Sequence, residues 1–268
     1  MDHFERLLRI LGTAPKSPSL QALTELVAAH LTRIPFENIS KLHYLQHYNL
    51  RALPGLEQYL DGIEHCHFGG TCYSNNYYFH LLLRNLGYQV KLCGADMNYS
   101  DVHVVNLVVV EGREYIVDAG YAAPFLEPLP RDLSQDYEVS LGRDRYLLKP
   151  QDGDGRSVMH LIRDGQLKHG YTIKPQHRAI DYFSGVIADS YRDEATFMNA
   201  LLLVRFWPGR SLAIHNLTVL ESAGSRWSTR QLPDRNTLVN AVAEHFAVPR
   251  EITAAALSRI GEFRNAWS

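Results

Sequence analysis

The stretch Phe68-Gly69-Gly70-Thr71-Cys72 opens the part of the chain that decides its fold. The paired glycines interrupt the preceding pattern, and apolar residues then recur at helical spacing as far as Leu86. We expect a helix that begins at Cys72, which places its sulfur beside the backbone N–H groups and the positive dipole end of that helix. Such a position favours a reactive thiolate. A buried cysteine that packs as a small hydrophobic residue is the alternative.

The hydrophobic pattern changes along the chain from helical to strand-like and then becomes mixed. We expect helices at residues 2–12, 20–33, 56–63 and 72–86. Strands are expected at 88–93, 103–110, 114–117, 137–149, 158–162 and 171–173. In the last third of the chain we expect helices at 180–191, 195–201, 236–246 and 250–263, and a strand pair at 211–220 and 225–232. This order predicts an α+β fold in three parts, residues 1–86, 87–185 and 186–268, with a sheet or small open barrel in the middle.

The composition restricts the class of protein. With 46% hydrophobic and 21% charged residues, the 268-residue chain resembles an ordinary globular protein. A net charge of -2 without a basic tract predicts no binding to nucleic acid or to a membrane surface. Three cysteines fit a reducing compartment better than a disulfide framework. Because the first residues are acidic and amphipathic, no signal peptide is expected, and we predict a cytoplasmic location.

His103 begins an apolar run that follows the polar loop 98–101. A histidine at a strand end beside a cleft can accept a proton from a thiol and pass it on. Since the chain has 13 histidines, an exposed and non-catalytic residue is the alternative. His65 and His67 flank Cys66, but no second cluster at ligand spacing accompanies them, so we expect no metal.

Asp118 ends another apolar strand, Tyr115-Ile116-Val117. An aspartate there is either a turn former or a buried carboxylate that needs a partner. The pair Glu111-Gly112 predicts a hairpin that brings this strand beside the one beginning at His103. The two side chains are then close, and Cys72, His103 and Asp118 have the order of a nucleophile, a base and a group that orients the base.

Four segments, in this order, resemble the arylamine N-acetyltransferases. They are Ile34-Pro35-Phe36-Glu37-Asn38-Ile39, Gly69-Gly70-Thr71-Cys72 followed by Asn76, then His103, and Val117-Asp118-Ala119-Gly120-Tyr121. Thr196-Phe197 and Ile214-His215-Asn216-Leu217 resemble the family more weakly. The resemblance implies a helical N-terminal lobe, a central β-barrel and a C-terminal α/β lobe, around a papain-like cysteine triad.

The resemblance also implies a ping-pong reaction. Cys72 would accept an acetyl group from the co-substrate acetyl-coenzyme A and pass it to the nitrogen of an arylamine or arylhydrazine. Backbone N–H groups, including that of Cys72, would form an oxyanion hole. Phe36 and Tyr121 match positions that line the acceptor pocket in the family, with ordinary core packing as the alternative. Ser100 is the candidate contact for the coenzyme, in a cleft between the barrel and the third lobe.

Three positions depart from the pattern of the family. Phe68 replaces an arginine that pairs with the glutamate matching Glu37, Ser74 replaces a Glu or Gln, and Ala122 replaces a glycine. These departures leave open a divergent acyltransferase with another amine or acyl donor, and a non-catalytic descendant that binds coenzyme. A papain-like hydrolase is a further alternative, although no local peptidase signature surrounds Cys72.

Overall fold

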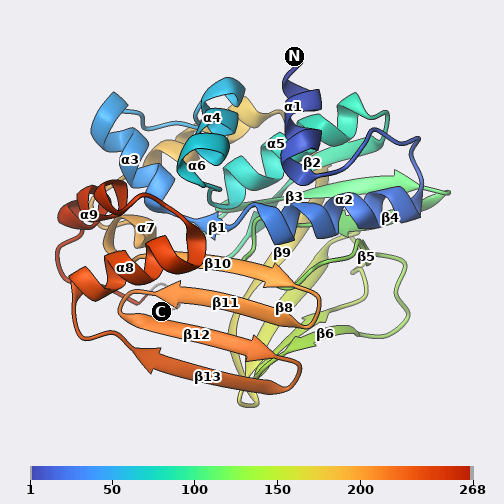
Figure 1. Cartoon of the computed structure of the whole chain (residues 1–268). Coiled ribbons are helices and arrows are strands. Elements are labelled where there is room, and N and C mark those ends of the chain that lie inside the picture. The colour runs from blue at the N-terminus through green and yellow to red at the C-terminus, as the bar shows by residue number, and fades with distance from the viewer. Residues whose placement is uncertain (1, 266–268) are drawn as a thin grey trace.

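Two antiparallel sheets and a set of helices form the protein in a computed structural model that describes residues 2–265 (Figure 1). The first third of the chain is mostly helical. Its elements are α1 (His3–Leu11), α2 (Leu20–Arg33), the short strand β1 (Phe36–Glu37), α3 (Ile39–Tyr48), α4 (Leu56–Cys66) and α5 (Cys72–Asn85). The mixed fold of helices and sheets is therefore as predicted.

The larger sheet has eight strands in the order β5-β4-β3-β2-β9-β8-β7-β6. They are β2 (Gln89–Asp96), β3 (His103–Val110), β4 (Arg113–Val117), β5 (Leu129–Pro130), β6 (Tyr137–Leu141), β7 (Asp144–Leu148), β8 (Ser157–Arg163) and β9 (Gln166–His177). The sheet curls into a half-barrel whose two edges are β5 and β6. The expected barrel is thus an open sheet. An irregularity between Cys93 and Ala95, where β2 pairs with β9, adds local twist.

The smaller sheet combines β1, from the first third of the chain, with four strands from the last third. Its order is β1-β10-β11-β12-β13, with β10 (Leu202–Trp207), β11 (Arg210–His215), β12 (Thr218–Ala223) and β13 (Arg226–Gln231). Phe36 of β1 pairs with Val204 of β10, so a segment near the N-terminus completes a C-terminal sheet. The remaining elements are the 3₁₀ turn η1 (Ile180–Phe183) and α6 (Ser184–Asp189), α7 (Thr196–Asn199), α8 (Arg235–Phe246) and α9 (Arg250–Arg259).

Some elements differ from the sequence-based expectation. Helix α3 and strand β10 were not expected, and the strand expected at 211–220 is two strands, β11 and β12, that turn at Asn216. Asn216 adopts φ 52°, a left-handed conformation that asparagine tolerates well. The last helix ends at Arg259 and does not continue to 263.

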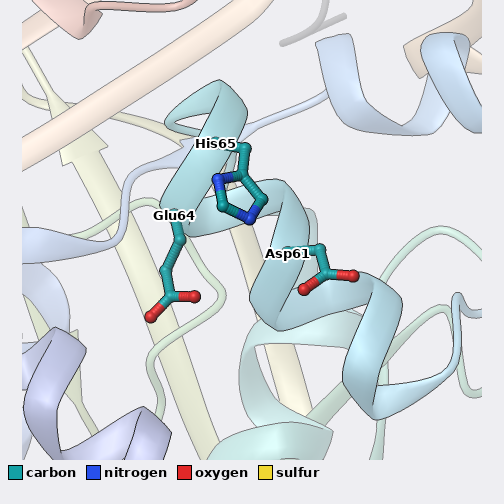
Figure 2. Close-up of side chains that lie close together, drawn as sticks. All are labelled: Asp61, Glu64 and His65. Atoms are coloured by element: carbon teal, nitrogen blue, oxygen red, sulfur yellow. The ribbon is translucent and has the colours of Figure 1, made fainter.

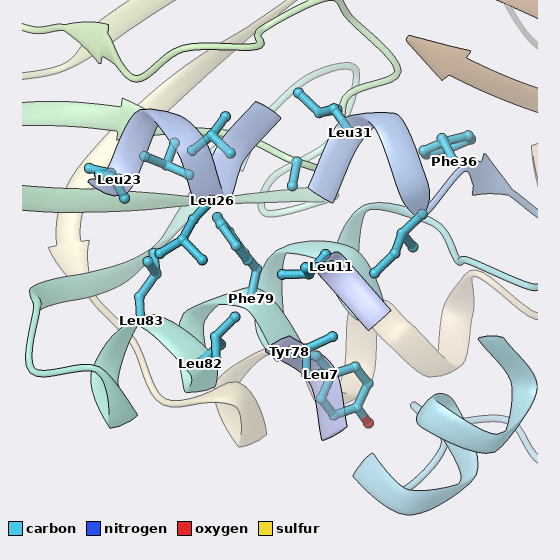
Figure 3. Packing of buried hydrophobic residues seen from close by; sticks show 14 of the residues in the cluster. Leu7, Leu11, Leu23, Leu26, Leu31, Phe36, Tyr78, Phe79, Leu82 and Leu83 are labelled. Atoms are coloured by element: carbon cyan, nitrogen blue, oxygen red, sulfur yellow. The ribbon is translucent and has the colours of Figure 1, made fainter. Parts of the chain in front are cut away.

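Helices α1, α2 and α5 share a hydrophobic core (Figure 3). Phe79 of α5 is fully buried and lies among leucines of the other helices, including Leu11 and Leu26. Burying each such side chain contributes about 1.5–3 kcal/mol. This packing fixes the axis of α5, and therefore the position of Cys72 at its first residue. Within residues 2–265, none of the helices is long and apolar enough to cross a membrane.

Candidate active site

The loop before Cys72 lies against β1. Gly70 forms a parallel bridge with Phe36, and its carbonyl accepts a hydrogen bond of 3.0 Å from the N–H of Glu37. A Cβ atom on Gly69 would lie 1.9 Å from the carbonyl oxygen of Pro35, so only glycine fits this approach. Helix α5 then begins at Cys72, as the sequence predicts, and the cysteine is half-buried.

His103 and Asp118 are in direct contact. Nε2 of His103 lies 2.8 Å from Oδ2 of Asp118, and neither side chain exposes more than 1% of its surface. The carboxylate accepts the hydrogen from Nε2, which leaves Nδ1 as the imidazole nitrogen available to a thiol. The sulfur of Cys72 lies 3.8 Å from the carbonyl oxygen of Val102, the residue before His103. The structure thus brings the three residues together at one end of β3 and β4.

The charges of the three residues are coupled. Burial lowers the pKa of His103, but the charge and hydrogen bond of Asp118, together with a hydrogen bond and the charge of Cys72, outweigh burial and raise it. Burial raises the pKa of Asp118, but the charge of His103 and three hydrogen bonds outweigh it and hold this pKa below its usual range. The site therefore favours a buried imidazolium at His103 paired with the carboxylate of Asp118.

Two further side chains orient the carboxylate of Asp118. The hydroxyl of Tyr171 donates to Oδ2 at 2.8 Å, and Nδ2 of Asn76 donates to Oδ1 at 2.9 Å. Asn76 also accepts from the N–H of Ala119 at 2.8 Å. Asn76 lies four residues after Cys72, and this spacing places both side chains on the same face of a helix. The sequence therefore contained a signal for the role of Asn76. Tyr171 comes from β9, and no local pattern pairs that strand with this site.

The two predicted acceptor-pocket residues lie in different surroundings. The ring of Tyr121 lies 5.7 Å from that of His103, and its hydroxyl is 2.9 Å from Nδ1 of His169. Phe36 packs against Phe197 with ring centroids 5.5 Å apart, and it reaches the cysteine loop through the bridge to Gly70 described above. Both residues also belong to hydrophobic clusters, but of the two it is the ring of Tyr121 that lies near the ring of His103.

Ser100 lies in the exposed loop before β3. Its hydroxyl is 3.1 Å from Oδ1 of Asp96 and 3.2 Å from Oδ2 of Asp101, and Nζ of Lys174 donates to it at 3.1 Å. Lys174 forms ion pairs with both aspartates. Two carboxylates beside Ser100 are unfavourable neighbours for the phosphates of a coenzyme. The contact of Ser100 with a coenzyme stays a prediction.

The structure shows the surroundings of two departures from the family pattern, Phe68 and Ala122. With no arginine at position 68, Glu37 is buried and accepts hydrogen bonds from the backbone N–H groups of Ser40 (2.9 Å) and Gly69 (3.1 Å). Burial raises the pKa of Glu37, and these bonds oppose the shift. Ala122 has φ 60°, a left-handed conformation that explains why a glycine suits this position.

One group of possible metal ligands is found among residues 2–265, on the surface of α4 (Figure 2). Asp61, Glu64 and His65 offer ligand atoms within 4.8 Å of one another. Arg6 forms ion pairs with both carboxylates, and Arg9 binds Glu64 at 2.7 Å. These cations neutralise the acids, so the cluster is an ordinary surface ion-pair network.

The fold is that of known arylamine N-acetyltransferase structures. The enzyme from Mycobacterium marinum in complex with CoA aligns with a TM-score of 0.79 and 20% identity, over 96% of this chain and 100% of that chain. The structure from Nocardia farcinica aligns with a TM-score of 0.76 and 25% identity, over 94% and 92% of the two chains.

Sequence comparison gives the family. A family model described as N-acetyltransferase matches residues 19–254. The pineal gland isozyme NAT-3 of arylamine N-acetyltransferase from Gallus gallus is 32% identical over 154 residues, which cover 54% of this chain and 49% of the relative. The match thus spans about half the length of that curated relative. This chain belongs to the arylamine N-acetyltransferase family.

Proposed function

We propose that the protein is an acyltransferase that moves an acetyl group from acetyl-coenzyme A to the nitrogen of an arylamine or arylhydrazine, by a ping-pong mechanism. The observation that carries this proposal is the buried contact between His103 and Asp118, with the sulfur of Cys72 beside them, 3.8 Å from the carbonyl oxygen of Val102. A cysteine alone would be a weak candidate, but a cysteine coupled to an oriented imidazole is an activated nucleophile.

In the first half-reaction, the thiolate of Cys72 attacks the carbonyl carbon of the thioester. The bond between that carbon and the sulfur of the coenzyme breaks, and His103 gives its proton to the departing thiolate. The N–H of Cys72, one of the first four of α5, is a candidate donor to the oxyanion. Asp118 keeps the imidazole in the tautomer that the transfer needs.

In the second half-reaction, the amine attacks the acetyl carbon bound to Cys72. The new C–N bond forms, the C–S bond to the cysteine breaks, and His103 takes the proton of the amine. Tyr121, whose ring lies near that of His103, and Phe36 are our candidates for the acceptor pocket. Ser100 remains our candidate for a coenzyme contact. The M. marinum relative was solved with CoA, which supports a CoA thioester as donor.

We also propose the lobe arrangement that accompanies this mechanism. The segment 1–86 would carry the nucleophile, 87–185 the histidine and aspartate, and 186–268 an α/β lid, around a papain-like triad. The use of Nε2 of His103 for Asp118, which leaves Nδ1 for the thiol, supports such a core.

Mass spectrometry of the intact protein tests the mechanism directly. After incubation with acetyl-coenzyme A alone, we expect one acetyl group on Cys72, and adding an arylamine should remove it and yield the acetylated amine. A panel of arylamines and arylhydrazines, tested with acetyl-coenzyme A and with longer acyl donors, would define the acceptor. If neither acetylation of Cys72 nor amine product is detected with any donor, the proposal is wrong.

Two assays separate the alternatives. In a non-catalytic descendant, iodoacetamide would label Cys72 no faster than free cysteine, whereas a reactive thiolate is labelled faster. In a hydrolase, p-nitrophenyl acetate would be turned over at a rate that added arylamine does not change. For the transferase, the amine competes with water and raises the turnover.

A further inference from the structure

A cavity beside the N-terminus of α5 has a single charged residue in its lining. The cavity is small, with a volume of about 30 Å³, and it is partly open to solvent. Lys41 of α3 contributes the charge, although the residue is only 8% exposed. Within the described residues 2–265, no aspartate or glutamate lines the cavity. Thr71 and Tyr73, the two neighbours of Cys72 in the sequence, line the same cavity, so it lies next to the proposed nucleophile.

The partners of the Lys41 ammonium group among residues 2–265 are neutral. Its Nζ donates to Oγ of Ser190 at 2.6 Å and lies 4.0 Å from the centroid of the Tyr191 ring. Over residues 2–265, no carboxylate lies within ion-pair distance of it. An ammonium carries three donors, and the protein fills one of them with a hydrogen bond. A buried cation without an acid is costly, and an apolar side chain would fill the same space at less cost.

The hydroxyl groups of Ser190 and Ser74, which line the cavity with Lys41, donate to backbone carbonyls. Oγ of Ser190 donates to the carbonyl oxygen of Ile187 at 2.6 Å, and Oγ of Ser74 donates to that of Thr71 at 3.2 Å. Among residues 2–265, Lys41 is therefore the one cationic donor that an anion in the cavity would meet. The N-terminus of α5, a helix of 14 residues, adds its positive dipole end to the same place.

The charge of Lys41 is coupled to that of Cys72. Burial lowers the pKa of Lys41 to about 7, and the negative charge of Cys72 opposes this shift. The two groups thus act on each other electrostatically. An anion bound beside Lys41 would favour its protonated form.

We propose that this cavity binds a carboxylate of the substrate, held by Lys41 while the reacting carbon lies at Cys72. The inference rests on the proposed acyl transfer, and it names the substrate class. The carboxylate belongs either to the acyl chain, as in a dicarboxylic thioester, or to the acceptor, as in an aminobenzoate. Both sources share the chemistry of a carboxylate facing a buried ammonium group.

Alkylation of Cys72 tests the charge without any acyl transfer. Iodoacetate attaches a carboxylate to the sulfur, whereas iodoacetamide attaches a neutral amide of similar size. We expect the ratio of their rates at Cys72, measured by peptide mass spectrometry, to fall about tenfold in Lys41→Met. Lys16→Met, which removes an exposed lysine, should leave the ratio unchanged. Methionine replaces a buried charge with an apolar chain of similar length, so the variant should fold.

Steady-state kinetics then identify the source of the carboxylate. The donor arm compares malonyl- and succinyl-coenzyme A with acetyl-coenzyme A, using one neutral arylamine. The acceptor arm compares 4-aminobenzoate with a neutral arylamine, using acetyl-coenzyme A. We expect the ratio of kcat/KM, charged over neutral, to fall at least about tenfold in Lys41→Met in one of the two arms, and that arm names the source.

The outcomes separate the two proposals. Equal ratios in the wild type and Lys41→Met, in both kinetic arms, would overturn the carboxylate site while leaving acyl transfer intact. If no acyl transfer is detected with any pair, the proposed function fails, and the alkylation ratio alone decides the carboxylate site. Should Lys41→Met fail to fold, a wild-type alkylation ratio no higher than that of free cysteine overturns the site.

Discussion

Gly120 approaches Cys72 so closely that a Cβ atom added to the glycine would lie 2.6 Å from the Cα atom of the cysteine. The same atom would lie 2.8 Å from the carbonyl oxygen of Cys72 and 2.7 Å from Nδ2 of Asn76. Two of these neighbours are backbone atoms, which cannot rotate away. The loop after Asp118 therefore meets the first turn of α5 only because residue 120 has no side chain.

Gly120→Ala should separate Cys72 from His103 and Asp118. Overpacking at such a site costs about 1–3 kcal/mol of stability. A displacement of about 1 Å in reacting groups costs about 100-fold in rate. We expect losses of this size in the free energy of unfolding and in kcat/KM. Gly153→Ala is the control, because no heavy atom lies within 4 Å of its added Cβ. Equal effects of the two substitutions would contradict this close-packing argument.

Cys72→Ser should reduce acetyl transfer to background, because serine lacks the nucleophilicity of a thiolate. His103→Ala should reduce kcat/KM by about 100- to 10,000-fold, the usual contribution of a general base. Both variants should keep the far-ultraviolet circular dichroism of the wild type. Cys66→Ser removes another half-buried thiol and should retain full activity. Substantial transfer by Cys72→Ser or His103→Ala would count against the mechanism.

Tyr171→Phe removes a single hydrogen bond from the carboxylate of Asp118 and leaves the ring in place. A hydrogen bond to a charged group contributes about 1.5–3 kcal/mol, so stability should fall by about this amount. The pKa of Asp118 should rise, because the bond from Tyr171 lowers it. Chemical denaturation measures the first effect. Tyr182→Phe is the control, since its hydroxyl makes only a 3.4 Å contact with Asp101. An equally small loss in both variants would show that Tyr171 does not brace the carboxylate.

The contact between His103 and Asp118 should stabilise the protein over a limited range of pH. The lowered pKa of Asp118 gives stability that is present above its unfolded pKa of about 3.9 and is lost as the pH falls. The raised pKa of His103, about 10, gives stability that is complete below its unfolded pKa of about 6.5. This second contribution disappears as the pH rises through the folded value.

The expected advantage of the wild type is therefore largest between about pH 4 and 6.5 and declines on both sides. The measurement is the free energy of unfolding as a function of pH, with the uncharged double variant His103→Gln/Asp118→Asn as the reference. A difference between the two proteins that stays constant from acid to alkaline pH would show that the two residues are not charged partners.

Local sequence signals predicted the contact between His103 and Asp118. The turn at Glu111-Gly112 joins β3 to β4, and both residues have positive φ, as a type I′ hairpin turn requires. Because the turn fixes which strands pair, the positions of His103 and Asp118 follow from their places along the two strands. The two glycines before Cys72 likewise predicted that a helix begins at this residue, and α5 does begin there.

Long-range features were not predictable in the same way. Tyr171 reaches Asp118 because β9 pairs with β2, a pairing between strands far apart in sequence. The apolar run that forms β10 is compatible with a strand or with a buried helix. It is a strand because it pairs with β1. Lys41 resembles any surface lysine in the sequence, and only the packing of α3 reveals that it is buried.

The pairing of Phe36 with Val204 has a consequence for synthesis of the protein. While the chain is still attached to the ribosome, β1 can bridge to Gly70, but its strand partner β10 has not yet emerged from the exit tunnel. The loop before Cys72 contacts β1 through Gly70. The pairing of β1 with β10, which holds β1 in the smaller sheet, therefore forms late in translation. A nascent chain released before Leu202 would contain Cys72, His103 and Asp118 and still lack the strand that holds their entrance in place.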